Sequence, residues 1–204
     1  MKYRLAAMIM AAGESSRFGS CKHLASLAGS TVLQQVVDVA NSCFENSVYV
    51  VTGRYHDEIQ KNIQHAKFII NSDWKDGLGK SIAVGVNHLA SSYDGLMIIL
   101  GDQVAITTTH LQLFAKAFDD EKITCAFYNG QNGVPALFPK SRFHSLQCLN
   151  GPQGAKSLLN RADVSINSIA MNAAAIDIDT RDQLLKINQQ RNSGPSNPVS
   201  GQPC

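Results

Sequence analysis

The chain has 204 residues, the size of one domain, and a chain of this length buries about 70% of the surface that it exposes when unfolded. Its 18 basic and 16 acidic side chains give a net charge of +2, which is no excess to hold a nucleic acid or an anionic membrane. No stretch approaches the roughly 20 consecutive apolar residues that cross a bilayer. We therefore expect neither nucleic acid nor membrane among its partners.

The cysteines and histidines exclude two common kinds of site. The five cysteines are odd in number and scattered, and no two form a C-x-x-C pair, which argues against a disulfide framework or a cysteine zinc site. The six histidines show neither H-x-x-x-H nor H-E-x-x-H spacing, so a histidine zinc site is unsupported too. A reducing compartment fits this usage best, and we expect a cytoplasmic protein. The cysteines are Cys21, Cys43, Cys125, Cys148 and Cys204.

The first twelve residues resemble a secretory signal, because a charged start at 1–4 precedes an apolar run at 5–12. The run is near the lower length limit for a signal, and it leads straight into a polar loop that contains glycine. We therefore interpret it as a buried first strand.

Short apolar runs rich in β-branched or aromatic residues recur along the first two thirds of the chain and predict strands. They lie at 5–10, 48–52, 67–70, 95–100 and 124–128.

The segments between these strands show helical spacing. One wide apolar face runs over 32–44 and another over 78–89. Thr107, Thr108 and Thr109 can cap a third helix. The residues that this helix should bury are Leu111, Leu113, Phe114, Ala117 and Phe118.

Strands that alternate with helices predict an α/β fold with crossover connections, in which helices cover both faces of a mostly parallel central sheet. We expect a Rossmann-like three-layer sandwich. Ligands of such sheets bind beyond the carboxyl ends of the strands, which points to the loops after residues 10, 70 and 100.

The regular alternation of predicted strands and helices ends after residue 128. The segment 129–139 is loop-like and then extended, and short helices are expected within 140–149 and 153–162. Further strands are expected at 164–169 and 173–179, followed by a helix from Thr180 to Gln190. We interpret 1–190 as a single domain. The last residues, 191–204, are dense in Ser, Gly, Pro and Asn and predict a disordered tail.

The loop after the first strand, 11–22, combines features that suit a polyphosphate. Gly13 lets the backbone approach an anion closely, and Arg17 and Lys22 supply positive charge. The spacing is not that of a Walker A loop, which needs G-x-x-x-x-G-K, nor of the dinucleotide fingerprint G-x-G-x-x-G. The segment GLGKS at 77–81 is no Walker A loop either, because its first glycine would fall on Trp74.

An aspartate follows the apolar run at 95–100, where it would stand at the carboxyl end of a central strand. Asp102 is thus placed to hold Mg²⁺, although it could also be a turn or capping aspartate. Asp177 and Asp179 are two residues apart, so a strand would point both to one face. Either could complete a metal site, or both could be surface acids.

The string A-A-G-x-S-x-R-F-G-x-x-K at 11–22 resembles the signature of the MobA-like NTP transferase family, especially its molybdenum cofactor cytidylyltransferase branch. The resemblance covers most of the chain, and its order and spacing make it specific. It implies a nucleotide-diphospho-sugar transferase-like fold. The other matching segments lie at 71–86, 100–103, 132–138, 149–159 and 175–185.

The resemblance implies a nucleotide-binding half at about 1–128 and an acceptor-binding lobe at about 129–190. Arg17 and Lys22 would bind the triphosphate, and Asp102, with Asp177 or Asp179, would bind Mg²⁺. The other implied nucleotide contacts are Ala11, Ala12, Gly13, Gly77, Gly79, Ser81 and Gly101. The implied acceptor contacts are Pro135, Gly151 and Gly154.

The implied reaction is the Mg²⁺-dependent transfer of CMP from CTP to the phosphate of molybdopterin, with release of pyrophosphate. The double alanine at 11–12 is typical of the cytidine-using branch.

Three positions depart from the family pattern: Val104 and Val134 replace a proline and an asparagine, and Pro152 replaces an aspartate. The last two lie in the acceptor lobe, so two alternatives stay open. One is transfer from GTP or CTP to another phosphorylated acceptor. The other is a catalytically silent nucleotide or pterin carrier for a molybdenum enzyme or its chaperone.

Overall fold

The computed structural model describes residues 3–192, and the remainder of the predicted tail, 193–204, lies outside the described residues. Arg191 and Asn192, which the sequence analysis assigned to the tail, belong to the last helix, α7 (Arg181–Asn192). Arg191 holds this helix to the body by donating hydrogen bonds to the Gln35 side chain and, at 2.8 Å, to the Val104 carbonyl oxygen.

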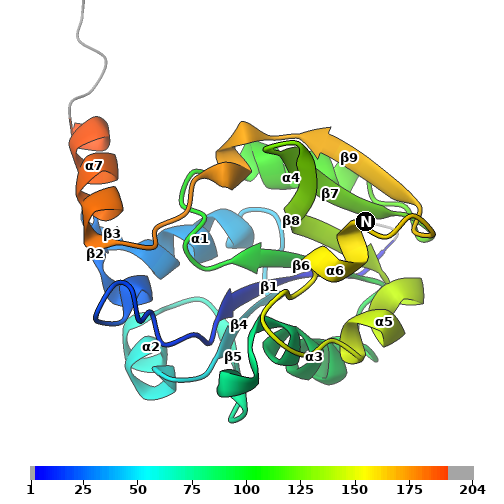
Figure 1. Ribbon diagram of the computed structural model, residues 1–204, viewed down its shortest axis with the longest axis horizontal. Coiled ribbons are helices and arrows are strands. Elements are labelled where there is room, and N and C mark those ends of the chain that lie inside the picture. The colour runs from blue at the N-terminus through cyan, green and yellow to red at the C-terminus, as the bar shows by residue number, and fades with distance from the viewer. Residues whose placement is uncertain (1–2, 193–204) are drawn as a thin grey trace, which may run out of the picture.

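A seven-stranded sheet forms the middle layer (Figure 1). All neighbouring strands are parallel except that β8 runs antiparallel to both β6 and β7, which confirms the mostly parallel sheet. In spatial order the strands are β5 (Lys67–Ile70), β4 (Val48–Thr52), β1 (Leu5–Ala11), β6 (Gly95–Leu100), β8 (Gln131–Pro139), β7 (Ile123–Tyr128) and β9 (Ile166–Ala170).

Helices cover both faces of the sheet, as expected for a three-layer sandwich. Alternate residues of β1 belong to two separate cores, with Ile9 on one face and Met8 on the other. Ile9 shares its core with α1 (Val32–Asn41), α2 (His56–Asn62) and α4 (Thr108–Lys116). Met8 shares its core with α3 (Leu78–Leu89), α5 (Phe143–Gln147) and α6 (Lys156–Leu159). Both cores lie against strands that are buried on both faces, which is why the strands read as continuous apolar runs.

Short elements join these layers. A two-stranded hairpin pairs β2 (Ser26–Leu27) with β3 (Ser30–Thr31) just before α1. The 3-10 helices are η1 (Lys22–Leu24), η2 (Trp74–Asp76), η3 (Lys140–Arg142) and η4 (Asn172–Ala175).

Two further expectations were wrong. The predicted strand at 173–179 is η4 followed by irregular chain. Leu113, expected to be buried by α4, has 44% of its surface exposed, although the predicted Thr107 cap is present and Leu111 and Phe114 are buried. Helix α2 was not predicted, because Ile59 is its only buried residue and gives no apolar periodicity.

The strand order brings the loops after β1, β5 and β6 to the same edge of the sheet. The carboxyl ends of β1, β4, β5 and β6 lie side by side at one edge of the sheet. No helix within residues 3–192 is both long and apolar enough to cross a membrane.

Candidate active site

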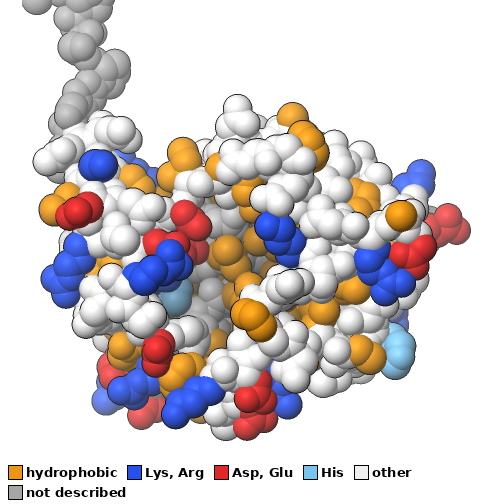
Figure 2. All heavy atoms as spheres, viewed as in Figure 1, with side chains coloured by type: hydrophobic (Ala, Val, Ile, Leu, Met, Phe, Trp, Pro, Cys, Tyr) orange, Lys and Arg blue, Asp and Glu red, His pale blue; other side chains and the backbone are white. Residues whose placement is uncertain are grey.

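A cleft of about 440 Å³ opens at the carboxyl ends of β1 and β6. In Figure 2 it is the hollow in the middle of the face, with basic and acidic side chains along one wall. Its lining comes from the loop after β1, the start of α3, the end of β6 and the segment before α7. The lining residues are Met10, Ala11, Ala12, Gly13, Glu14, Ser15, Ser16, Arg17, Lys22, His23, Trp74, Gly77, Leu78, Ser81, Leu100, Asp102, Asp177 and Asp179.

The loop after β1 folds back on itself before it reaches Lys22. The backbone N–H groups of Phe18 and Gly19 both donate to the Ser15 carbonyl oxygen, at 2.9 and 3.1 Å. The Lys22 N–H donates to Ser15 Oγ at 3.4 Å. Gly13 lies at the mouth, and a Cβ there would meet nothing within 4 Å. The loop therefore presents open backbone at its start, Arg17 in its middle and Lys22 at its end.

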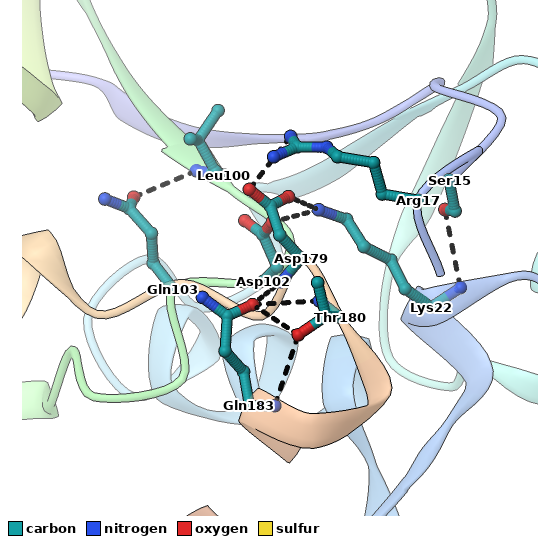
Figure 3. A network of polar contacts seen from close by, with 9 residues as sticks. All are labelled: Ser15, Arg17, Lys22, Leu100, Asp102, Gln103, Asp179, Thr180 and Gln183. Carbon is teal, nitrogen blue, oxygen red and sulfur yellow. Dashed lines mark hydrogen bonds and ion pairs between the residues drawn. The ribbon is translucent and has the colours of Figure 1, made fainter. Parts of the chain in front are cut away.

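Four charged side chains of the cleft, Arg17, Lys22, Asp102 and Asp179, form one network (Figure 3). Lys22 Nζ lies between two carboxylates, in a close contact with Asp102 and 3.0 Å from Asp179 Oδ1. Arg17 Nη2 lies 2.9 Å from the other oxygen of Asp179. The Lys22 and Asp102 side chains are only 14% and 8% exposed, whereas that of Arg17 is 73% exposed. Lys22 is thus enclosed at the floor, whereas Arg17 is paired with Asp179 and remains largely open to solvent.

The electrostatics of the network follow from burial and pairing. Burial acts to lower the pKa of Lys22, but the charges and hydrogen bonds of Asp102 and Asp179 outweigh it and raise that pKa above its ordinary value. Burial acts to raise the pKa of Asp179, yet Lys22 and Arg17 hold it below its usual range. For Asp177, burial together with the neighbouring charges of Asp102 and Asp179 outweighs the charge of Lys22 and raises its pKa. The cleft is therefore charged in both signs at neutral pH.

His23 forms a neutral part of the floor. It is 4% exposed, and burial together with the charge of Lys22 lowers its pKa to about 3. Its Nδ1 atom is buried without a hydrogen-bond partner among the described residues. A neutral ring here adds no charge to the cluster beside it.

Asp179 is oriented by the first turn of α7. The backbone N–H groups of Asp179 and Thr180 donate to Gln183 Oε1 at 2.9 and 2.8 Å, and the Gln183 N–H donates to Thr180 Oγ1 at 3.3 Å. This reciprocal arrangement is a capping box. It fixes the backbone that carries the Asp179 carboxylate.

Residues 7–166 match the MobA-like NTP transferase domain family, which is most of the chain. The chain belongs to this family.

Solved structures share the fold of this MobA-like domain. Rv0371c from Mycobacterium tuberculosis H37Rv has a TM-score of 0.82 at 22% identity, covering 91% of this chain and 97% of that one. Molybdopterin-guanine dinucleotide biosynthesis protein A from Archaeoglobus fulgidus has a TM-score of 0.65 at 14% identity, over 92% and 99% of the two chains. A CMP:2-keto-3-deoxy-manno-octonic acid synthetase complexed with CTP has a TM-score of 0.69 at 15% identity, over 93% and 99%. At these sequence identities the similarity shows a shared fold alone.

The cleft of the MobA-like domain gathers most of the residues that the sequence analysis selected for nucleotide and metal. Gly79 and Gly101 are not among its lining residues. A Cβ at Gly79 would lie 2.7 Å from the Asn150 carbonyl oxygen, and one at Gly101 would lie 3.0 Å from the His23 ring. Both glycines therefore allow close packing behind the cleft. Ser81 lines it and accepts a hydrogen bond from Asn71 Nδ2 at 2.9 Å.

The three residues selected for an acceptor lie outside this cleft but close to it. The Gly151 carbonyl oxygen accepts from the Gly79 N–H at 2.9 Å, and Gly154 packs against Leu78. Pro135 lies in β8 and follows Val134, which lines a second cavity of about 170 Å³. This second cavity shares Leu78 and Leu100 with the cleft, so the two spaces adjoin.

Sequence reasoning missed several lining residues. Trp74 and Leu78 lie within three residues of Gly77, which was selected for the nucleotide. Their place in the cleft lining could therefore have been inferred from that of Gly77. His23 follows Lys22 directly, but no sequence pattern indicates that its ring is buried.

Carboxylates suitable for a hard cation line the cleft of the MobA-like domain. Asp102, Asp177 and Asp179 offer oxygen ligands, which Mg²⁺ prefers. Within residues 3–192, however, no three His, Cys, Asp or Glu side chains are grouped closely enough to hold a metal ion by themselves. The donor set fits a cation that draws the rest of its ligands from a bound phosphate.

Proposed function

We propose that this protein transfers CMP from CTP to the phosphate of molybdopterin and releases pyrophosphate. The observation that carries the proposal is the convergence of Arg17, Lys22, Asp102 and Asp179 in one cleft at the carboxyl edge of the sheet. Such a position is where open α/β sheets bind their ligands.

The two cations would hold the triphosphate. In the cleft Arg17 and Lys22 are paired with carboxylates, and phosphate oxygens would replace part of that pairing. Arg17 offers a planar fork of donors, and Lys22 a compact charge. Open backbone at Ala11, Ala12 and Gly13 would lie against the nucleotide.

A magnesium ion would be held by Asp102, with Asp177 or Asp179 and the triphosphate oxygens. When bound it would neutralise phosphate charge. A solved structure of Rv0371c, with a TM-score of 0.77 at 20% identity, contains manganese, which supports a divalent cation in proteins of this fold.

The chemistry demands little covalent work from the protein. An oxygen of the acceptor phosphate attacks the α-phosphorus of CTP, one bond forms there, and the bond to the β-phosphate oxygen breaks, so pyrophosphate leaves with its electron pair. The residues of this chain position the groups and stabilise their charge. Lys22, held at the floor, would oppose the negative charge on the triphosphate.

The acceptor would lie toward the second cavity, in the lobe at 129–190. That cavity adjoins the cleft at Leu78 and Leu100, and its wall includes Val134. The structural neighbours include a molybdopterin-guanine dinucleotide biosynthesis protein and a synthetase complexed with CTP, which supports this choice of acceptor and donor. The single-domain division at 1–190 and the cytoplasmic location remain predictions.

Substitution of the network tests the proposal. We expect Lys22→Met and Asp102→Asn each to slow pyrophosphate release from CTP, Mg²⁺ and molybdopterin by about 100-fold or more, the usual loss when a group that stabilises transition-state charge is removed. Lys122→Met is the matched control, because Lys122 is exposed and its ammonium lies 4.0 Å from the Asp119 carboxylate, outside the cleft lining. Circular dichroism would show whether each variant is folded.

Unchanged turnover in either cleft variant would contradict the proposed roles. Turnover with GTP instead of CTP, or with another phosphorylated acceptor, would keep the transfer and correct the substrate. Nucleotide or pterin binding without pyrophosphate would favour the carrier.

A further inference from the structure

Helix α7 lies against the loop after β1, although the two are more than 150 residues apart in the chain. The family match ends at residue 166 and so does not cover this helix. Asn188 bonds the hairpin that follows the loop, since its Oδ1 accepts from the Ala28 N–H at 3.0 Å and its Nδ2 donates to the Ser26 carbonyl oxygen at 3.3 Å. The helix is thus attached to the same stretch of chain that carries the two cleft cations.

Arg181, the first residue of α7, makes the contact nearest to Arg17. Its Nε donates to the Phe18 carbonyl oxygen at 3.2 Å, and its Nη2 donates to Ser20 Oγ at 3.3 Å. Its guanidinium also lies 5.5 Å from the centre of the Phe18 ring, and Phe18 is only 5% exposed. One side chain therefore holds both residues that flank Gly19, directly after Arg17.

The same turn of α7 restrains Arg17 from its other side. Asp179 precedes Arg181 by two residues and binds the Arg17 guanidinium at 2.9 Å. The capping box of Thr180 and Gln183 fixes the Asp179 backbone. The loop segment directly after Arg17 is therefore held by Arg181, and the Arg17 guanidinium is held by Asp179, while most of the Arg17 side chain is exposed.

We propose that Arg181 is a positioning residue for nucleotide binding, which acts by fixing the loop so that Arg17 faces the cleft. It touches no ligand itself, because it is not among the residues that line the cleft. Without it the loop would sample other conformations, and the ordering of Arg17 would have to be supplied when the triphosphate binds. This inference rests on the proposed function, since it assumes that Arg17 binds a nucleoside triphosphate.

The test is calorimetric binding, with Mg²⁺, of whichever of CTP, GTP and ATP binds the wild-type protein best. We expect Arg181→Ala to raise the dissociation constant about fivefold to tenfold, as the loss of one part-buried and one exposed hydrogen bond and of their ordering effect implies. Arg161→Ala is the control, because the exposed Arg161 guanidinium pairs with Asp163 and does not line the cleft. The affinity of this control variant for the nucleotide should equal that of the wild type. Added guanidinium ion should restore part of the affinity of Arg181→Ala and leave the control unchanged.

A double-variant cycle separates positioning from a general structural role. If Arg181 acts through Arg17, Arg17→Ala should cost less affinity in the Arg181→Ala background than in the wild type. Equal costs in both backgrounds, or wild-type affinity in Arg181→Ala, would overturn the inference. Should Arg181→Ala fail to fold, Arg181→Lys, which keeps the charge but loses the fork, takes its place with the same criteria. Absence of nucleotide binding by the wild type would instead overturn the proposed function.

Discussion

Lys22 shows how a nearly neutral protein can prepare a site for a highly charged ligand. Its ammonium lies between Asp102 and Asp179, so the protein itself compensates the charge of Lys22. A buried cation without partners would be costly, and the carboxylates remove that cost. The net charge of +2 therefore says little about the cleft, where a few fixed charges are focused on one place.

His23 predicts a dependence of stability on pH. Its pKa in the folded protein is about 3, whereas an unfolded histidine titrates near pH 6.5. Between these values the unfolded chain binds a proton that the folded chain does not. The free energy of unfolding should therefore fall by about 1.4 kcal/mol for each pH unit below about 6.5 from this group alone.

Urea unfolding at pH 6.5 and pH 5.0 measures this effect. We expect His23→Gln to lose clearly less stability than the wild type over that interval, and His88→Gln, at an exposed position, to keep the wild-type dependence. Equal losses in His23→Gln and the wild type would show that His23 is not buried and neutral.

At the scale of elements, the start of α3 and the segment at 149–154 touch through their backbones. A Cβ at Gly79 would lie 2.7 to 2.9 Å from three backbone atoms of Asn150, which cannot move as a side chain can. Glycine is therefore required by packing at a helical position where alanine usually stabilises.

Gly79→Ala should lower the free energy of unfolding by about 1–3 kcal/mol, the usual cost of overpacking, in spite of its helix propensity. Gly13→Ala is the matched substitution, because a Cβ at Gly13 meets nothing within 4 Å, and its thermal midpoint should equal that of the wild type. A stabilised Gly79→Ala variant would contradict the close packing of these two segments.

The strands were easier to predict than the segments that complete the site. The five predicted strands of the first 128 residues agree with the structure to within one residue at each end. In β1, β4 and β6 burial on both faces leaves a continuous apolar run, whereas β5 is a partly exposed edge strand. Residues 173–179 alternate like a strand, yet they form η4 and irregular chain, held by a hydrogen bond from Gln103 Nε2 to the Ala174 carbonyl oxygen. Ile178 is fully buried but Ile176 is 46% exposed, so the alternation of Ile and Asp at 176–179 corresponds to neither a strand nor a uniformly buried apolar face.

The site was predictable in part for the same reason. Arg17, Lys22 and Asp102 follow strands whose carboxyl ends meet, so sequence order alone brings them together. The contacts of Arg181 and the burial of His23 depend on how α7 and η1 pack, and no local pattern of residue types records that packing.

For the whole molecule, the parallel sheet and the position of α7 together bring distant parts of the chain to one cleft. The sheet places the loops after β1 and β6 side by side, and α7 closes the same edge with Asp179. The cleft therefore takes residues from the beginning, middle and end of the chain. A nucleotide bound there would contact all three parts, so binding should stabilise the entire domain by mass action.

The most direct test of nucleotidyl transfer is the release of pyrophosphate by the wild-type protein with CTP, Mg²⁺ and molybdopterin. We expect one pyrophosphate for each cytidylylated acceptor, and none when the acceptor or the divalent cation is left out. Binding of CTP, GTP or ATP with no pyrophosphate from any of them, in the presence of acceptor and Mg²⁺, would contradict the account.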